Sequence, residues 1–323
     1  MSQTMCQQAN PVIIEPQECS YEAFPASTRA AAGMHVLPAD LSGRSCRIHT
    51  GVAYAEKSGM QLHLHIIEPR LREGEDAAFP LVIYIQGSAW FAQNTGAELA
   101  QLARFARRGF VVAVVEYRPS PVAPFPAQVK DAKTALRFMR THAATYHADP
   151  NQIIVWGDSS GGHTATMVGV TLDVPGLDDE SPADDPMPGT MGHAVAVRAI
   201  IDYYGPSDIS KMNEEPSIMD HRGPATPEGM LIGGRPVLAH PELVGPTIPM
   251  SYLSPDKPIP PFLIIHGDKD RLVPFGQSVM LFEALTAANK QVEFYKLAGA
   301  DHGGPAFWTE DVLDIVERFV RIR

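Results

Sequence analysis

Residues 153–162 read Ile-Ile-Val-Trp-Gly-Asp-Ser-Ser-Gly-Gly and join a short apolar run to a segment with helical character at 160–172. Gly157, Ser159 and Gly161 supply the pattern G-x-S-x-G in a strand–turn–helix context. Such a tight turn needs small residues, and it lifts the serine hydroxyl clear of the sheet at the start of a helix, whose dipole favours developing negative charge. The stretch therefore predicts a nucleophilic serine. The alternative is a glycine-rich turn with an incidental serine.

A serine hydroxyl is a poor nucleophile without a base. The candidate base is His302, which follows a strand-like segment at 291–298, and the candidate carboxylate is Asp270, in the loop after a strand predicted at 262–265. Open α/β sheets place their ligands at the carboxyl ends of strands, where all three side chains would meet. The order Ser159, Asp270, His302 is the order expected of an α/β-hydrolase.

Other polar residues near these motifs have simpler interpretations. Asp268 follows Gly267 directly and is better placed to hold the turn with backbone hydrogen bonds than to reach the histidine. We interpret His163 as a residue of the first helical turn and His266 as the end of a strand.

The loop after the strand predicted at 81–85 is the candidate oxyanion site. Its small residues allow the backbone N–H groups of Gly87 and Ser88 to approach an oxyanion, with the N–H of Ser160 completing the set. Trp90, at the end of this loop, either lines the acyl side of a pocket or simply packs in the core.

Strand-like and helix-like segments alternate from residue 81 onwards, which predicts an α/β domain. Short continuous apolar runs indicate strands buried on both faces of a parallel sheet, at 81–85, 110–115, 153–156, 195–201 and 262–265. Amphipathic spacing predicts helices at 96–108, 127–142, 276–289 and about 308–321. We thus expect a mostly parallel central sheet flanked by helices.

The rest of the chain predicts an irregular N-terminal arm over 1–45 and one domain over 46–323. Two more strands, 46–55 and 60–68, open this domain, and the second carries a His63-x-His65 pair that is more typical of a polar strand face than of a metal site. Two insertions are expected: an acidic, proline-rich loop at 173–193 and a proline- and glycine-rich segment at 211–250 that could form a small lid.

Composition restricts the possible partners. The 323 residues carry a net charge of −11 and contain no stretch rich in Lys and Arg, so we expect neither nucleic acid nor an anionic membrane as partner. Three cysteines, Cys6, Cys19 and Cys46, form neither a metal-ligand pattern nor a disulfide framework. The polar start lacks the regions of a signal peptide, which predicts a cytoplasmic protein. We expect no metal and no cofactor, and the sequence carries no signal of an oligomeric state.

These stretches resemble the α/β-hydrolase serine esterases, and most closely the BD-FAE-like branch of bifunctional feruloyl and acetyl esterases acting on plant carbohydrate. The resemblance spans about 80–321 and rests on five stretches: Gln86–Trp90, Gly157–His163, Asp202–Ile209, His266–Pro274 and Asp301–Gly303. Related esterases and kynurenine formamidases usually have His-Gly-Gly where this chain has Gln86-Gly87-Ser88, a change that backbone donors survive. Tyr204, in the third stretch, is with Trp90 a candidate for the substrate pocket.

The resemblance implies a cofactor-free carboxylic-ester hydrolase that works through an acyl-enzyme on Ser159. Its substrates would be acetyl or feruloyl esters on xylan-type oligosaccharides or small esters. An arylformamidase and a small-peptide hydrolase of the prolyl-oligopeptidase type would use the same three residues. The alternative from another class is a ligand-binding pseudo-hydrolase, against which the presence of Ser159, Asp270 and His302 argues.

Overall fold

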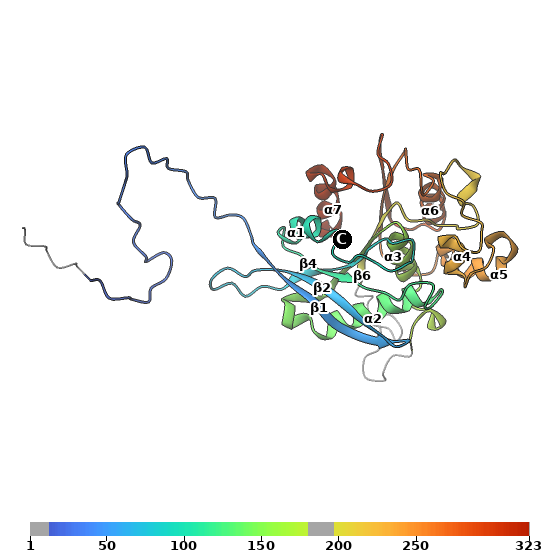
Figure 1. The fold of residues 1–323 in the computed structure, drawn as a ribbon, viewed down its shortest axis with the longest axis horizontal. Coiled ribbons are helices and arrows are strands. Elements are labelled where there is room, and N and C mark those ends of the chain that lie inside the picture. The colour runs from blue at the N-terminus through green and yellow to red at the C-terminus, as the bar shows by residue number, and fades with distance from the viewer. Residues whose placement is uncertain (1–12, 180–196, 323) are drawn as a thin grey trace, which may run out of the picture. The chain divides into compact units, whose positions relative to one another are not determined.

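The computed structural model describes residues 13–179 and 197–322, and the chain divides into two compact units, Met1–Ser42 and Gly43–Arg323. Over residues 13–42 the first unit holds neither helix nor strand, and its side chains are exposed. A terminal segment that buries so little apolar surface gains little from folding on its own. All the elements named below belong to the second unit (Figure 1).

Within the described residues one eight-stranded sheet forms the centre of the second unit, with strands in the order β1-β2-β4-β3-β5-β6-β7-β8. The strands from β3 to β8 are mutually parallel, whereas β2 pairs antiparallel with both β1 and β4. Their bounds are β1 Cys46–Lys57, β2 Met60–Pro69, β3 Phe79–Ile85, β4 Val111–Val115, β5 Ala148–Asp158, β6 Val197–Tyr203, β7 Phe262–Gly267 and β8 Val292–Leu297. This is the mostly parallel sheet that the apolar runs predict.

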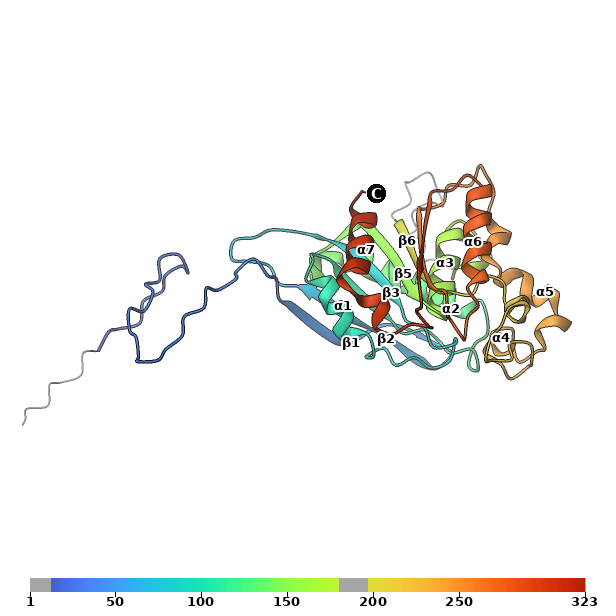
Figure 2. The ribbon, with the colours of Figure 1, turned by 90° about the horizontal axis from the view of Figure 1, so that it is seen from above.

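Helices cover both faces of the sheet (Figure 2). On one face lie α1 (Leu99–Ala106) and α7 (Glu310–Ile322), and on the other lie α2 (Ala127–Thr141), α3 (Ser160–Val170) and α6 (Gly276–Ala287). Alternate residues of each strand supply the two cores: in β3, Leu81 and Ile83 pack with the α2 side and Val82 and Tyr84 with the α1 side. This double covering explains why the central strands β3 to β7 carry continuous apolar runs.

The segment at 211–250 is built from short helices rather than from open loop. It contains α4 (Pro227–Leu231), α5 (Pro241–Val244) and several 3₁₀ turns. Both helices and the turns Gly245–Thr247 and Pro249–Tyr252 have a proline at their first helical positions. These helices are too short for the periodicity by which sequence predicts longer ones. They pack around a small core of their own, made by Trp90, Ile209, Leu231, Ile232, Val237 and Val244.

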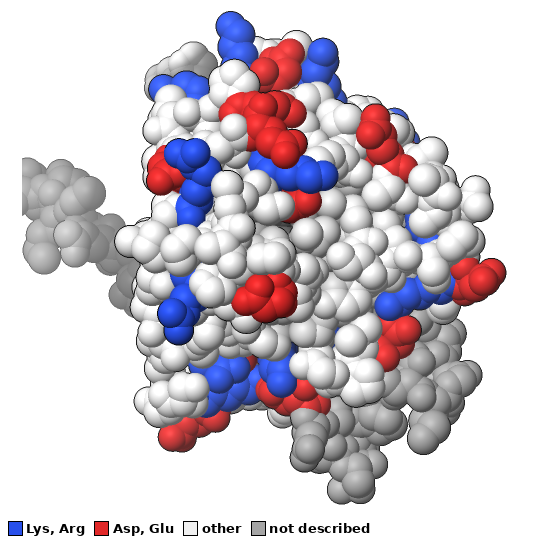
Figure 3. All heavy atoms as spheres, turned by 90° about the vertical axis from the view of Figure 1, so that its right-hand side faces the viewer, with Lys and Arg blue, Asp and Glu red and all other residues white. Residues whose placement is uncertain are grey.

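The face that carries α4 and α5 has acidic and basic side chains interspersed over a mostly uncharged surface (Figure 3). Nothing on this face concentrates the positive charge that a polyanion needs. In the part of the chain that the structure describes, no helix combines the length and the apolar character needed to cross a membrane.

The acidic insertion at 173–193 is described only as far as residue 179, and the remainder lies outside the described residues. In its first part Asp178 pairs with Arg137, with 2.7 Å between Oδ1 and Nη1, and Asp179 pairs with Lys57. The start of this segment is therefore held against α2 and β1 by ion pairs. The strand predicted at 195–201 is observed as β6, and residues 195–196 lie outside the described range.

Candidate active site

Ser159 lies on the turn between β5 and α3, in a conformation that side-chain-bearing residues rarely adopt. Its backbone angles are φ 52° and ψ −128°, and its N–H donates to the Tyr203 carbonyl over 2.8 Å. A Cβ on Gly161 would lie 1.9 Å from the Ile85 carbonyl oxygen, and one on Gly157 would lie 2.1 Å from the Gly161 oxygen. The glycines of the motif are therefore required by close backbone approach around a strained serine.

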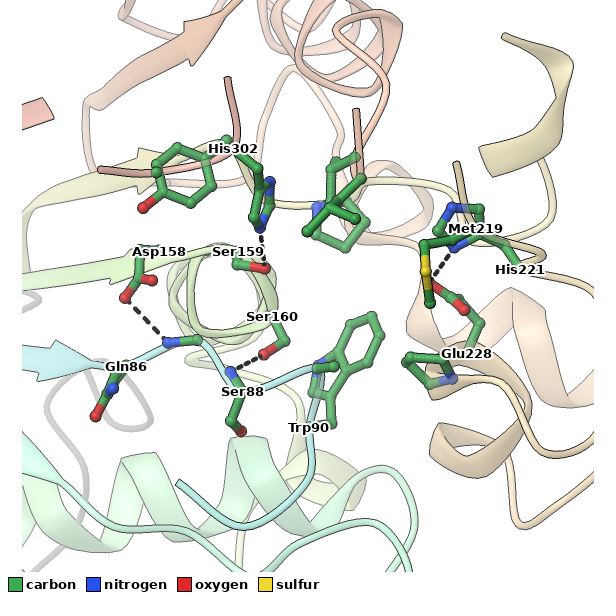
Figure 4. Close-up of a pocket in the computed structure, with 18 of the residues that line it drawn as sticks. Gln86, Ser88, Trp90, Asp158, Ser159, Ser160, Met219, His221, Glu228 and His302 are labelled. Atoms are coloured by element: carbon green, nitrogen blue, oxygen red, sulfur yellow. Dashed lines mark hydrogen bonds and ion pairs between the residues drawn. The ribbon is translucent and has the colours of Figure 1, made fainter. Parts of the chain in front are cut away.

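His302 connects this serine to the acid predicted for it. Its Nε2 lies 2.9 Å from Ser159 Oγ (Figure 4), and its Nδ1 lies 2.6 Å from Asp270 Oδ2. The Tyr204 ring packs edge-on against the imidazole, with 4.7 Å between the ring centres. The three predicted side chains, from loops after β5, β7 and β8, are thus within hydrogen-bonding distance in one line.

Asp270, rather than Asp268, is the carboxylate that reaches the histidine. Its side chain is fully buried, and its Oδ1 accepts the N–H groups of Leu272 and Val273, each over 2.8 Å. Burial alone would raise the pKa of Asp270, but hydrogen bonds from His266 and His302 outweigh it and hold the pKa well below its usual range. Asp268 instead accepts the Gly299 N–H over 2.6 Å, the turn-holding role expected for it.

His266 contributes more to the site than its interpretation as a strand end indicated. The ring is fully buried, with Nε2 3.1 Å from Asp270 Oδ2 and Nδ1 2.7 Å from Ser278 Oγ. It therefore helps to hold the carboxylate that orients His302. The sequence signal for this role is its spacing of four residues before Asp270 across a tight turn.

Asp301 ties the histidine loop to the acid loop. Its Oδ1 accepts the N–H of His302 over 2.8 Å and the N–H of Arg271 over 3.1 Å. The Arg271 guanidinium, 2.7 Å away at its Nε, lowers the pKa of Asp301 to about 2. The spacing between the two loops is therefore set by hydrogen bonds as well as by the strands.

The predicted oxyanion donors need a correction. The Gly87 N–H donates to Asp158 Oδ1 over 3.0 Å, and the Ser88 N–H donates to Ser160 Oγ over 2.9 Å (Figure 4). Both groups thus have protein acceptors, because two polar side chains lie beneath the loop. Among the described residues the N–H groups of Ser160 and of Ala89, which has a positive φ of 54°, have no such acceptor.

Asp158, which the sequence did not single out, is a partly buried residue directly before the serine. Besides the Gly87 N–H, its Oδ1 accepts the Tyr84 hydroxyl over 2.7 Å. Burial raises the pKa of Asp158, and these hydrogen bonds and the nearby His302 offset part of the rise. Burial, followed by the charge of Asp158, also raises the pKa of Glu98 in the same pocket.

The serine opens into a pocket of about 400 Å³. Strand-end loops supply one side of it, including Gln86–Trp90, Asp158–Ser160, Tyr204 and His302–Gly304. The segment at 211–250 supplies the other, with Met219, His221, Pro227 and Glu228. Trp90 lines the pocket and also packs in the small core of that segment, and Tyr204 lines the pocket as well.

The other histidines singled out have structural partners. His163 is buried against Trp90 with its Nε2 2.8 Å from the Thr247 carbonyl, and burial lowers its pKa to about 4. His63 pairs with Glu116, and the ring nitrogens of His65 contact the Gly51 N–H and Thr95 Oγ1. No group of three or more His, Cys, Asp or Glu side chains suited to a metal occurs within residues 13–179 and 197–322.

Comparison with known proteins agrees with this geometry. A family model described as BD-FAE matches residues 65–285. The curated relatives include esterase LipC of Mycobacterium tuberculosis, 30% identical over 228 residues, a match covering 69% of this chain and 53% of LipC. Esterase LipQ of the same organism is 29% identical, covering 72% of this chain and 52% of LipQ. This chain therefore spans about half the length of these relatives.

Among solved structures, a truncated carbohydrate esterase from gut microbiota superposes with a TM-score of 0.70 at 30% identity. The match covers 88% of this chain and 98% of that one. A bifunctional GH43-CE protein from Bacteroides eggerthii gives a TM-score of 0.68 at 31% identity, covering 86% of this chain and 38% of that one. The α/β-hydrolase architecture expected from the sequence is thereby confirmed.

Proposed function

This chain belongs to the BD-FAE family, and we propose that it is a serine carboxylic-ester hydrolase. The observation that carries the proposal is the line of hydrogen bonds from Ser159 Oγ through His302 to Asp270, which ends in an open pocket. A serine activated by a base, with the base oriented by a third group, is the arrangement that acyl transfer requires. The relatives LipC and LipQ are named as esterases, which agrees with this chemistry.

In the proposed reaction Ser159 Oγ attacks the ester carbonyl while His302 Nε2 takes its proton. The new C–O bond gives a tetrahedral oxyanion, and its collapse breaks the bond to the alcohol, which leaves with the proton from His302. Water then attacks the acyl-enzyme with the same histidine as base, and the acid is released. Asp270, fixed by two backbone N–H groups and His266, keeps the imidazole oriented throughout.

The oxyanion needs backbone donors that are free to face the pocket. Of the three predicted donors, we retain the N–H of Ser160. Ser160 begins α3, and its N–H has no protein acceptor among the described residues. We add Ala89 N–H, which lines the pocket under the same condition. Ser88 N–H can contribute only by sharing or leaving Ser160 Oγ, and Gly87 N–H is held by Asp158 and is the weakest of the predicted donors.

We propose acetyl or feruloyl esters of plant-derived, xylan-type oligosaccharides as the substrates. Two solved structures that superpose well are a carbohydrate esterase and a GH43-CE protein, which supports carbohydrate esters for this chain. A pocket of about 400 Å³ is near the lower end of the usual range for small-molecule sites and suits a short or a planar acyl group. The cytoplasmic location and the limits of arm and domain stay predictions.

A hydrolysis panel tests the proposal. It contains acetyl, butyryl, octanoyl and feruloyl esters together with N-formylkynurenine, and it is paired with labelling of Ser159 by a fluorophosphonate. We expect labelling and the highest kcat/KM on acetyl or feruloyl esters. Preference for N-formylkynurenine would assign an arylformamidase instead, preference for octanoyl esters a lipase, and the absence of both labelling and turnover a ligand-binding protein.

A further inference from the structure

Glu228, in α4 of the segment at 211–250, is a buried carboxylate with one oxygen paired and one unpaired. Its Oε1 accepts from His221 Nδ1 over 2.8 Å. The residue is only 3% exposed, yet its Oε2 has no hydrogen-bond partner among the described residues. A buried, unpaired oxygen of this kind costs free energy, so its presence calls for a ligand that can pair with it.

The Glu228 carboxylate cannot easily turn to satisfy both oxygens, because its partner is itself held in place. His221 is 4% exposed, and its Nε2 lies 2.9 Å from Ser217 Oγ. Ser217 Oγ lies in turn 3.1 Å from the Leu272 carbonyl, in the loop that carries the acid of the proposed triad. His221 is therefore a positioning residue that fixes Oε1 and leaves Oε2 directed elsewhere.

A second buried polar atom in the same pocket is also unpaired. The Trp90 side chain is 2% exposed, and its Nε1–H has no acceptor within the described part of the chain. Figure 4 shows Glu228, His221 and Met219 together on the side of the pocket away from His302, with Trp90 between them and Ser159. Besides Gln86 Oε1 in the loop after β3, the lining residues thus hold one unpaired acceptor, in Glu228, and one unpaired donor, in Trp90, both just beneath the pocket surface. These are the two functions that a hydroxyl group can satisfy.

The charges of the pocket decide which hydroxyl compounds it suits. Its lining includes the carboxyl groups of Glu98, Asp158 and Glu228 and, among the described residues, no Lys or Arg. An anionic substrate would meet repulsion and no cationic partner. A neutral, hydroxyl-bearing ester meets neither obstacle.

We propose that Glu228 Oε2 and Trp90 Nε1 form a hydroxyl-recognition subsite for the substrate of Ser159. This proposal rests on the proposed ester hydrolysis. It gives the segment at 211–250 the role of selecting neutral, hydroxylated esters. A substrate hydroxyl donates to Glu228, and a hydroxyl oxygen accepts from Trp90. The unbranched Met219 side chain, 42% exposed and beside the carboxylate in Figure 4, rotates to admit the hydroxyl.

The hydroxyl could belong to the sugar alcohol or to the phenol of a feruloyl group, and paired substrates distinguish the two. The first pair is an acetylated methyl xyloside and cyclohexyl acetate, which share the acyl group and ring size. The second pair is methyl ferulate and methyl 3,4-dimethoxycinnamate, in which the phenol is capped. In each pair only the first member has the hydroxyl in question, so the ratio of their kcat/KM values reports the subsite.

We expect the wild-type ratio to exceed one in at least one pair, and Glu228→Gln to lower that ratio about 10- to 100-fold. Glutamine keeps the shape and an oxygen for His221 but removes the charged acceptor, whose hydrogen bonds are about twice as strong as neutral ones. Trp90→Phe should lower the ratio about fivefold through loss of the N–H. Glu242→Gln changes an exposed glutamate of the same segment that pairs with His240, and it should leave the ratio unchanged.

The subsite would be refuted if Glu228→Gln changed kcat/KM equally for both members of both pairs and also lowered the melting temperature. Glu228 would then have a structural role only. Failure of the proposed function looks different: the wild type would neither turn over any ester nor react with a fluorophosphonate. Binding of the same four esters to Ser159→Ala, measured by calorimetry with and without Glu228→Gln, tests the subsite independently of turnover. A Kd that weakens for hydroxylated esters alone supports the subsite, and an unchanged Kd refutes it.

Discussion

The two sides of the pocket differ in how the chain builds them. On one side, Ser159, Asp270 and His302 each follow a strand of the same sheet, and the strand order alone brings them together. On the other side, Glu228 and Met219 come from short helices and turns that depend on their own small core for their shape.

The two sides also treat their carboxylates differently. Every oxygen of Asp270 is paired, with two backbone N–H groups on one and two histidines on the other. Glu228 has one oxygen paired and one free. A fully paired acid suits a group that must hold another residue still, whereas a partly paired acid suits one that receives a ligand. In the function that we propose, the sheet edge supplies the chemistry and the inserted segment supplies the selection.

The largest expected effect is on the sheet side, from Ser159→Ala. Loss of the nucleophile should lower kcat by about 10⁴-fold or more and abolish fluorophosphonate labelling, with little change in melting temperature. The matched control is Ser251→Ala, at an exposed serine directly after the inserted segment, and it should leave kcat unchanged. Retention of a tenth of wild-type turnover in Ser159→Ala would place the nucleophile elsewhere.

Two neighbouring carboxylates provide the next test. Asp270→Asn keeps the shape but removes the charge that orients His302, and should lower kcat by up to about 10⁴-fold. Asp268→Asn should lower stability by about 1–2 kcal/mol through the Gly299 hydrogen bond and change kcat little. Steady-state kinetics and urea unfolding separate the two outcomes. The assignment of the acid is wrong if Asp268→Asn is the inactive variant.

The lowered pKa of Asp270 also predicts a pH dependence of stability. A carboxyl whose pKa is lower in the folded than in the unfolded state stabilises the fold above its unfolded pKa. That contribution is lost as the pH falls through the folded value. The wild type should therefore lose urea stability more steeply than Asp270→Asn as the pH is lowered from 5 to 3. Parallel slopes in the two proteins would contradict this expectation.

Two glycines, one at the sheet edge and one in the inserted segment, differ in the space around their backbone. Gly161→Ala would place a Cβ 1.9 Å from the Ile85 oxygen, and should cost about 3–5 kcal/mol of unfolding free energy or prevent folding. Gly233, in the inserted segment, has φ +83°, and a Cβ added there would meet no atom within 4 Å, so Gly233→Ala should cost only about 1 kcal/mol. Chemical denaturation of both variants gives the comparison, and similar costs would remove the contrast.

The last expected effect is on the pH dependence of stability and concerns Asp202. This residue lies behind the serine turn and accepts the Gly205 N–H over 2.9 Å. Burial raises its pKa to about 7. The folded state therefore binds a proton that the unfolded chain loses near pH 4, and stability falls as the pH rises through about 7. Asp202→Asn should remove this loss. The unfolding free energy of the variant minus that of the wild type should therefore be about 2–4 kcal/mol larger at pH 8 than at pH 4.

Urea midpoints at pH 4 and pH 8 measure the Asp202 effect. Glu242→Gln in the inserted segment is the control, because the pKa of Glu242 is lowered by its hydrogen bond to His240. Glu242 therefore titrates near the acid end of the range from pH 4 to pH 8. Glu242→Gln should not show the gain in stability over wild type that Asp202→Asn shows as the pH rises to 7. An equal gain in both variants would indicate a general charge effect rather than burial of Asp202.

Sequence by itself determined most of the sheet and the three residues of the proposed triad. Apolar runs mark strands buried on two faces, and short-range sterics around Gly157 and Gly161 place Ser159 at a strand end. Because β5, β7 and β8 are parallel strands of one sheet, the loops after them lie at the same edge, even when their residues are 143 positions apart like Ser159 and His302. These features follow from periodicity and local geometry, and both can be recognised in the amino-acid sequence itself.

Only the tertiary structure decided which polar groups remain free. Gly87 N–H is taken by Asp158, 71 positions away, so a predicted donor is occupied, while Glu228 Oε2 is left unpaired because His221 is held by Ser217. A hydrogen bond depends on distance and direction between atoms from distant segments, to a few tenths of an ångström. No periodicity in the sequence encodes that precision, and packing alone sets which donors and acceptors are left for a substrate.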